Sequence, residues 1–140
     1  MANKEYHYAI WRRKETSAVV KLFGKGTGTF NVKTANGVEK TLQQYFGGNE
    51  YLYQNATSPF TVLGADHLKQ FDAQIKIVGG GISGQADAIK LAFARALIDR
   101  NSDLRLTLKP YGLLKRDPRI KERKKPGLKK ARKSPTWSKR

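Results

Sequence analysis

Alternating apolar and polar positions predict β-structure in the first third of the chain. Tyr6, Tyr8 and Ile10 recur at every second residue, which is the period of a pleated strand. Residues 16–23 form a β-branched, apolar run that is typical of a buried strand. The first part of the chain is therefore expected to be rich in strands.

Glycine-rich turns divide the next segments. Residues 24–28, with the sequence Gly-Lys-Gly-Thr-Gly, predict a turn, and extended structure resumes over residues 29–33, so the two flanking segments predict a hairpin. The turn lacks the glycine-to-lysine spacing of a phosphate-binding loop. The pair Asn36-Gly37 is a strong signal for a tight turn.

Two short elements are expected further along. Thr41 is placed to cap a short helix over residues 42–46, which Gly47-Gly48 ends. Pro59 then predicts the start of another extended run over residues 60–63.

The strongest patterns lie in the second half of the chain. Residues 71–78 alternate between apolar and polar side chains, which predicts a strand that ends at Gly79-Gly80-Gly81. A long helix follows, with Ser83 as its N-cap and Asn101 beyond its end. Its apolar positions recur at steps of three and four residues: Ala86, Ile89, Phe93, Ala96 and Leu97.

Residues 104–109 fit two structures. The three leucines of this segment alternate with polar residues, as in a strand. A cap at Asn101 or Ser102 and the four-residue spacing of the outer leucines also fit a short helix before Pro110. The pattern alone slightly favours the strand.

The glycine motif before the long helix has three interpretations. Residues 79–84 match the G-x-G-x-x-G fingerprint, and a strand over residues 104–108 would complete a dinucleotide-binding βαβ unit. Against this, the acid of the fingerprint ends the second strand, whereas Asp103 precedes that segment. The alternatives are a turn that lets helix and strand pack closely, and a helix start whose N–H groups approach a phosphate of RNA.

Composition then excludes several classes of protein. The chain has 140 residues and no cysteine, which allows one modest core and excludes disulfides, thiolate metal sites and thiol nucleophiles. No apolar run is long enough to span a membrane, and we expect no signal or transit peptide. His7 and His67 lack partners at metal-ligand spacing and the acids are scattered singly. We therefore expect neither a cofactor nor an enzyme.

The charge points to a polyanionic partner. Lys and Arg number 28 against 11 Asp and Glu, a net charge of +17. Residues 113–140 hold 13 of these cations and two of the acids, a net charge of +11, and prolines interrupt them at 118, 126 and 135. We expect this segment to be disordered alone and ordered on a phosphate backbone. Trp137 is placed either to stack on a base or ribose or to lie against another protein.

Four segments of the sequence carry a family likeness. Residues 79–97 read GGGISGQADAIKLAFARAL, and residues 112–140 form a basic block that ends in Trp-Ser-Lys-Arg. Arg12-Arg13-Lys14 and the loop at residues 24–32 add to the pattern. Together these blocks resemble the ninth small-subunit ribosomal protein family in its bacterial form, which usually ends in Phe-Ser-Lys-Arg.

The resemblance implies an α+β fold. It would contain a mixed sheet of about four strands, helices packed on one face and a left-handed βαβ crossover. Residues 102–111 would be helical, against the strand that their alternation favours. The resemblance also implies a globular rRNA-binding domain over residues 1–112 and an extended basic tail over residues 113–140.

The implied function is structural. The protein would lie in the head of a bacterial small ribosomal subunit in the cytoplasm, bound to 16S-type ribosomal RNA and neighbouring ribosomal proteins, without a membrane partner. Its last residues would contact the anticodon stem-loop of transfer RNA in the peptidyl (P) site: Ser138, Lys139 and Arg140. The residues expected to bind ribosomal RNA are Arg12, Arg13, Lys14, Lys25, Gly80, Gly81, Ser83, Gln85, Lys115, Arg116, Arg119, Arg123, Lys124, Lys125, Lys129, Lys130, Arg132 and Lys133. The alternative is a free-standing protein that binds RNA or DNA through charge alone.

Overall fold

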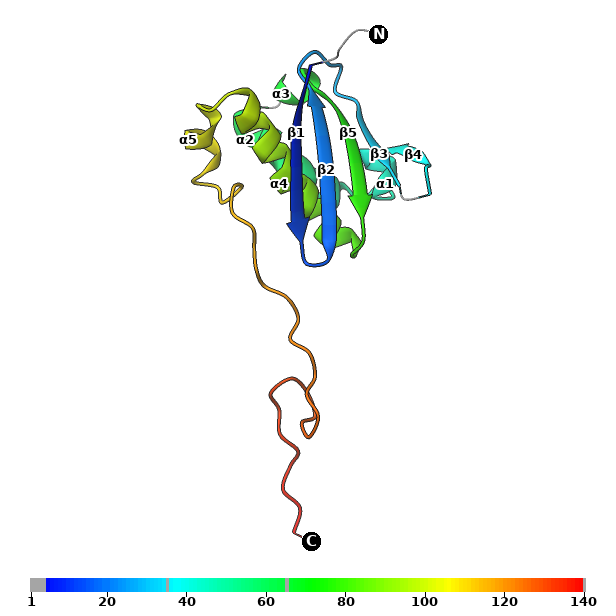
Figure 1. The fold of residues 1–140 in the computed structure, drawn as a ribbon, viewed down its shortest axis with the longest axis vertical. Helices are drawn as coiled ribbons and strands as arrows, with labels where there is room; N and C mark the ends of the chain where they lie inside the picture. Colours follow the sequence, from blue (N-terminus) through cyan, green and yellow to red (C-terminus); the bar gives the residue numbers. More distant parts are fainter. Residues whose placement is uncertain (1–4, 35, 65, 140) are drawn as a thin grey trace.

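A five-stranded mixed sheet with helices on one face forms the folded part of the computed structural model, which describes residues 5–34, 36–64 and 66–139 (Figure 1). The strands are β1 (Tyr6–Arg13), β2 (Thr16–Phe23), β3 (Phe30–Lys33), β4 (Glu39–Thr41) and β5 (Asp72–Val78). The helices are α1 (Leu42–Tyr45), α2 (Glu50–Leu63), α3 (Asp66–Lys69), α4 (Ile82–Arg100) and α5 (Leu104–Leu108). The predicted α+β fold is confirmed, with five strands rather than about four.

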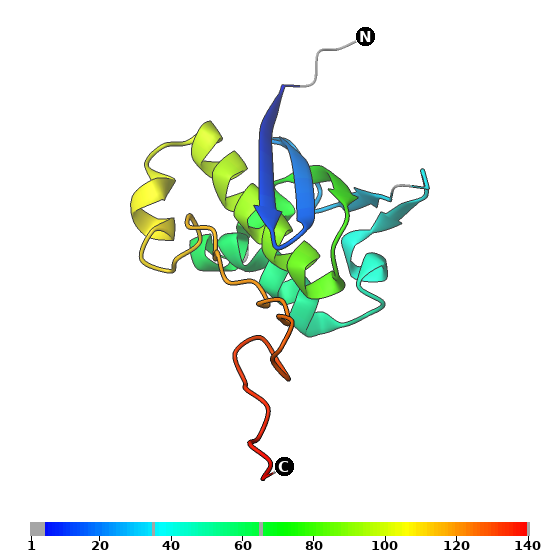
Figure 2. The same cartoon turned by 60° about the horizontal axis from the view of Figure 1, so that its bottom comes forward.

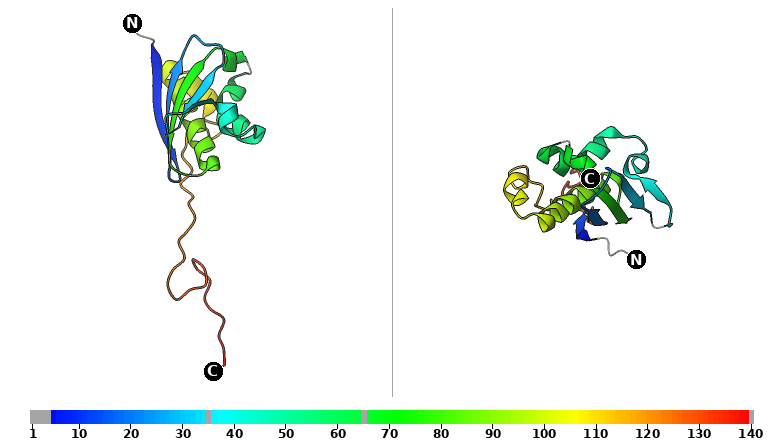
Figure 3. Two further views of the ribbon diagram at one scale, coloured as in Figure 1. Left: turned by 90° about the vertical axis from the view of Figure 1, so that its right-hand side faces the viewer. Right: turned by 90° about the horizontal axis from the view of Figure 1, so that it is seen from above.

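The order across the sheet is β1-β2-β5-β3-β4, and only the pair of β3 and β5 is parallel. In Figure 1, β5 points down, β3 lies to its right and the helices lie behind the sheet. Figure 3 shows the same arrangement from the side, with the helices on one face. The connection from β3 through these helices to β5 is therefore left-handed, as expected from the family resemblance and against the usual right-handed preference.

Residues 24–28 do not make the predicted hairpin turn. β2 pairs with β1 and β5, whereas β3 pairs with β4 and β5, so this loop crosses from one side of β5 to the other. Gly26 allows the crossing, because a Cβ there would overlap the backbone nitrogen of Asp72. The Asp72 carboxylate accepts hydrogen bonds from the backbone N–H groups of Thr27 and Thr29, at 2.8 and 2.9 Å, and holds the loop in place.

The core lies between the sheet and helices α2 and α4. α4 packs on β1 and β2, and six of its ten buried residues are Gly or Ala, which lets the helix approach its neighbours closely. Phe30 of β3, Phe60 of α2 and Phe93 of α4 form an aromatic cluster, with ring centroids 5.0–5.5 Å apart. The predicted periodicity of this helix is thus confirmed, and Asn101 follows its end as expected.

The extended run expected after Pro59 is wrong, because this segment is the last turn of α2. Asn49 caps the helix by accepting a hydrogen bond from the N–H of Leu52, at 3.3 Å. Pro59 has no N–H to donate to the carbonyl of Asn55, and the Ser58 hydroxyl donates to that carbonyl instead, at 2.9 Å. Side-chain compensation and packing against α4 therefore keep the proline inside the helix.

Two predictions around α4 and α5 are corrected. Helix α4 begins at Ile82 with Gly81 as N-cap, so Ser83 lies inside the helix and does not cap it. Residues 104–108 form helix α5 and not a strand, because Leu108 is fully buried while Leu106 is exposed. Among residues 101–139 there is no strand, so the dinucleotide-binding unit is not formed. The short helix predicted after Thr41 is confirmed as α1, with a capping box between Thr41 and Gln44.

Candidate RNA interface

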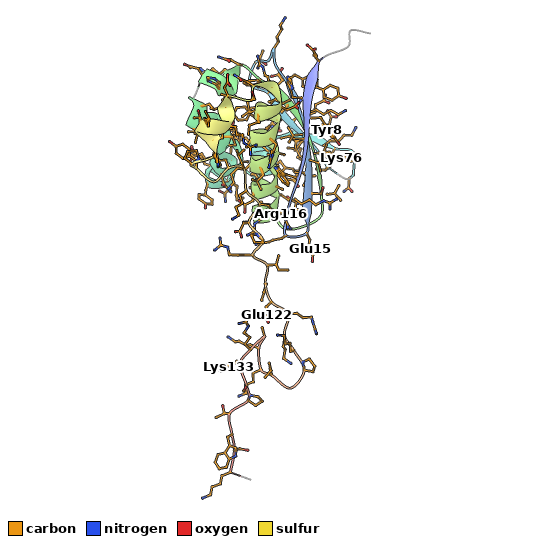
Figure 4. All side chains as sticks on the ribbon, turned by 60° about the vertical axis from the view of Figure 1, so that its left-hand side comes forward. Tyr8, Glu15, Lys76, Arg116, Glu122 and Lys133 are labelled. Atoms are coloured by element: carbon orange, nitrogen blue, oxygen red, sulfur yellow. The ribbon has the colours of Figure 1, made fainter. Side chains whose placement is uncertain are left out.

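Three of the predicted RNA-binding blocks, which are far apart in the sequence, meet at one end of the sheet. They are the β1–β2 turn with Arg12 and Lys14, the glycine loop of residues 79–81 with the first turn of α4, and residues 115–119, where the tail leaves the domain. We call this region the basic end. Figure 2 shows the tail departing beside the start of α4, and Figure 4 places Arg116 near Glu15 of the β1–β2 turn.

The glycine loop packs directly on the β1–β2 turn. Gly79 and Gly80 have φ angles of +73° and +69°, and a Cβ on Gly80 would overlap the Thr16 hydroxyl. Thr16 is buried, and its hydroxyl donates a hydrogen bond to the carbonyl of Gly79, at 3.2 Å. The glycines therefore serve close helix–sheet packing, and they leave the exposed Gly81 at the first turn of α4 without a side-chain cap.

Gln85 is held by contacts within the domain. Its side-chain N–H groups donate to the carbonyls of Gly79 and Gly80, at 3.2 and 3.3 Å, and its carbonyl accepts from the Tyr45 hydroxyl, at 2.9 Å. Burial raises the pKa of Tyr45, while this hydrogen bond opposes the rise. Gln85 thus orders the glycine loop, whereas Ser83, two residues earlier, is exposed.

Arg13 fastens the tail to the domain. It is only 7% exposed, and its guanidinium lies among three elements. One Nη donates to the carbonyl of Arg119, at 2.6 Å, and the other donates to the carboxylate of Asp117, at 3.2 Å. Its Nε lies 3.5 Å from the carboxylate of Asp87 in α4. We call Arg13 and its partners Asp87, Asp117 and Arg119 the tail clamp.

The clamp is supported on both sides. On one side, Arg116 donates a hydrogen bond from Nε to the carbonyl of Arg12, at 3.1 Å. On the other, Arg95 donates a hydrogen bond to the carbonyl of Leu114, at 3.3 Å. The Arg95 guanidinium also lies 5.1 Å from the centre of the Trp11 ring. Hydrogen bonds from Arg119 hold the pKa of Asp117 well below its ordinary value, and the charge of Arg13 adds to the effect. The Asp117 carboxylate therefore keeps its charge to a lower pH than an ordinary aspartate does.

We expect Arg13→Gln to release the start of the tail, because Gln has neither the two forked Nη donors nor the charge that faces Asp87 and Asp117. Distances between spin labels on cysteines at Glu50 and Ile120 should spread over a wider range, and the melting temperature should fall by a few degrees. The chain has no other cysteine to label. Arg12→Gln, whose side chain is exposed, is the control and should leave the distances narrow. Equal widths in both variants would contradict the clamp.

Beyond the clamp the tail runs away from the domain without a helix or strand, as far as residue 139 (Figure 1). Its second carboxylate, Glu122, binds Lys125 and Arg132, each at 2.8 Å. These ion pairs fold residues 122–133 into a loop, which Figure 4 shows as the approach of Glu122 and Lys133. Both acids of the tail are thus engaged within the chain.

The predicted RNA-binding cations fall into three groups. Arg13 is buried, and Arg119, Lys125 and Arg132 pair with the tail's carboxylates. Lys25 lies in the crossing loop, at the opposite end of β2 from the basic end. The others are exposed and, in the described residues, make no ion pair within 4 Å: Arg12, Lys14, Lys115, Arg116, Arg123, Lys124, Lys129, Lys130 and Lys133.

The tip of the tail carries the residues expected to meet transfer RNA. Ser138 and Lys139 are exposed, and Trp137 beside them is 81% exposed. Arg140 lies outside the described residues. The tip therefore presents one ammonium group and one indole ring to solvent.

The sequence did not reveal the roles of Asp87 and Arg95. Both lie on α4, where helical periodicity explains the apolar positions and treats these two as solvent-facing. No local signal marked them, because Asp87 pairs with Arg13 and Arg95 bonds to Leu114, and both partners lie far along the chain. Within the described residues no group of His, Cys, Asp and Glu is placed to hold a metal ion. None of the described helices is long and apolar enough to cross a membrane.

Comparison with known proteins gives one consistent result. Residues 11–140 match the ribosomal protein S9/S16 family. The chain is 46% identical to the small ribosomal subunit protein uS9c of Emiliania huxleyi over 132 residues, which cover 94% of this chain and 95% of that protein. It is 44% identical to uS9 of Malacoplasma penetrans over the whole length of both proteins. It is 45% identical to uS9 of Thermus thermophilus over 139 residues, which cover 97% of this chain and 99% of that protein.

Proposed function

Because the chain belongs to the ribosomal protein S9/S16 family, a family of structural proteins and not of enzymes, we propose how its parts serve the small ribosomal subunit. The globular domain, residues 1–112, binds ribosomal RNA in the subunit head. The tail, residues 113–140, threads between RNA helices toward the P site. The observation that carries this proposal is the meeting of three blocks, far apart in the sequence, at the basic end, from which the charged tail departs.

The physical support is the distribution of unpaired cations. At the basic end, the exposed Lys14 lies against Gly84 in the first turn of α4, whose N–H groups suit a phosphate. Arg12 and Arg116 are exposed at the same end of the sheet, where they add charge for further phosphates. Along the tail, the exposed lysines would each replace a counterion of the RNA backbone. The Pro residues prevent one continuous helix in the tail, which suits passage between RNA helices.

The test of RNA binding is incorporation into small subunits. The purified protein should assemble into reconstituted subunits and co-sediment with them through a high-salt wash. Chemical footprinting with and without the protein should show protection in the head of the subunit. Recovery of the protein only in the soluble fraction would contradict the proposal and favour binding through charge alone.

The tip of the tail is proposed to contact the anticodon stem-loop of P-site transfer RNA. Lys139 supplies a cation, and Ser138 supplies a hydroxyl for a phosphate or ribose oxygen. This contact would hold the transfer RNA without reading its sequence, because backbone contacts carry no base information.

We expect deletion of residues 138–140 to weaken transfer RNA binding in the P site by a few-fold, with normal subunit assembly. Two cations are lost, and each backbone contact contributes modestly at physiological salt. The dissociation rate of transfer RNA from purified subunits is the measurement. A tail of equal length with Lys139→Gln and Arg140→Gln separates charge from length. A dissociation rate equal to that of the full chain would refute the contact.

The compartment follows from the ribosome that holds the protein. Two of the relatives named above come from bacteria, and the protein of Emiliania huxleyi carries the name uS9c. We propose a bacterial-type ribosome in the cytoplasm, with neighbouring proteins of the subunit head as further partners. Sedimentation of the tagged chain with ribosomes of its own cell would test this.

A further inference from the structure

The sheet has a second face, which none of the described helices covers. It consists of the alternate residues of β1, β2 and β5 that point away from α4, and we call it the open face. Its members are Tyr6, Tyr8, Ile10, Arg12, Ser17, Val19, Lys21, Phe23, Asp72, Gln74, Lys76 and Val78. Figure 4 shows Tyr8 and Lys76 on the side of the sheet away from the helices.

Large apolar side chains are exposed on this face. Tyr6, Tyr8 and Ile10 are 47%, 48% and 49% exposed, and Val78 is 53% exposed. On β1, the residues that alternate with Tyr6, Tyr8 and Ile10 point toward the helices, and among them Ala9 is buried. Strand β1 is the edge of the sheet, so its two tyrosines form an exposed aromatic row along that edge.

Cations are interleaved with these rings. Across the sheet Tyr8 is opposite Lys21, and Ile10 is followed by Val19 and then Lys76. The ammonium of Lys21 lies 4.9 Å from the centre of the Tyr6 ring, which orients both groups. The carboxylate of Asp72, at one end of the face, is already engaged by the N–H groups of Thr27 and Thr29.

We propose that the open face binds a single-stranded segment of RNA, whose bases stack on Tyr6 and Tyr8 and whose phosphates pair with Arg12, Lys21 and Lys76. Exposed aromatic rings among cations on a sheet are suited to single strands, because every base has a flat face and every linkage a negative charge. A protein partner would have to bring a matching set of carboxylates to avoid burying unpaired cations.

The open face is continuous with the basic end. Arg12 is its last member on β1 and is followed by Arg13 of the tail clamp, and the Arg12 carbonyl accepts the hydrogen bond from Arg116. A strand of RNA that leaves the tail can therefore pass onto the open face without leaving the protein surface. This inference rests on the proposed function, since it assigns a further RNA contact to the same protein.

The test compares full-length variants for binding to an oligouridine of about 12 nucleotides over a salt series. The double variant Tyr6→Ala and Tyr8→Ala should bind about thirtyfold more weakly or worse, with an unchanged salt slope, because stacking releases no counterions. The pair Lys21→Gln and Lys76→Gln should instead make the slope shallower by about 1.4. Tyr8→Phe should retain affinity, and Tyr51→Ala, which removes a ring 75% exposed on α2, is the matched control.

A second measurement identifies the partner in reconstituted subunits. A photocrosslinking amino acid in place of Tyr8 should attach to ribosomal RNA, and a crosslink to a protein would overturn the proposal. Equal oligouridine affinities of the tyrosine variants and the unaltered protein would also overturn the proposal. In that case, a strong loss of affinity on tail deletion in the same assay would leave the proposed function standing. Failure of the unaltered protein to bind RNA at all would overturn both.

Discussion

Deletion of residues 114–140 should lower the affinity for ribosomal RNA by about a thousandfold or more at physiological salt. The deletion removes 13 of the 28 cations, and the loss of that many phosphate contacts changes affinity by orders of magnitude. Filter binding to a three-dimensional fragment of head ribosomal RNA, over a salt series, measures both the affinity and the slope. Circular dichroism melting checks that the domain is folded, since Leu114 is half-buried and its removal costs some packing.

A pair of charge-matched variants separates the tail from charge in general. One replaces four tail lysines with Gln: Lys124, Lys129, Lys130 and Lys133. The other replaces four exposed cations of the domain: Lys40, Lys69, Arg105 and Lys109. The tail variant should reduce the salt slope by about three, at 0.7–0.9 per contact, while the domain variant should change it little. Equal effects would indicate binding through net charge alone.

The second large effect concerns stability. Gly80→Ala should lower the free energy of unfolding by about 3 kcal/mol, because a left-handed φ costs an L-residue about 1–2 kcal/mol and overpacking adds a similar amount. Gly80 has a φ of +69°, and a Cβ there would overlap the hydroxyl of the buried Thr16. Urea unfolding followed by circular dichroism measures the change.

The adjacent glycine supplies the control. Gly81 has a φ of −92° and nothing within 4 Å of the position a Cβ would take, so Gly81→Ala should cost less than about 1 kcal/mol. Similar losses in the two variants would show that close packing on the β1–β2 turn is not what requires Gly80.

Local pattern was sufficient where an element depends on its own residues. The two-residue period of residues 71–78 and the three- and four-residue steps of α4 identified both elements, because each buries one face against the core. The local pattern predicted the wrong secondary structure where contacts with distant residues determine it. Pro59 stays helical because Ser58 satisfies the Asn55 carbonyl and α2 packs on α4. Residues 104–108 are helical because only the outer leucines can be buried at that point.

The amino-acid sequence by itself determined that this protein meets a polyanion, since the excess of positive charge and its concentration in residues 113–140 are properties of composition. It also determined the two most regular elements and, through four segments, the family. Only the tertiary structure decided which cations are available: it buries Arg13 in the tail clamp, pairs Arg132 with Glu122 and exposes Tyr8 on the open face. Pairing and burial depend on groups brought together from distant parts of the chain, and no local pattern encodes that proximity.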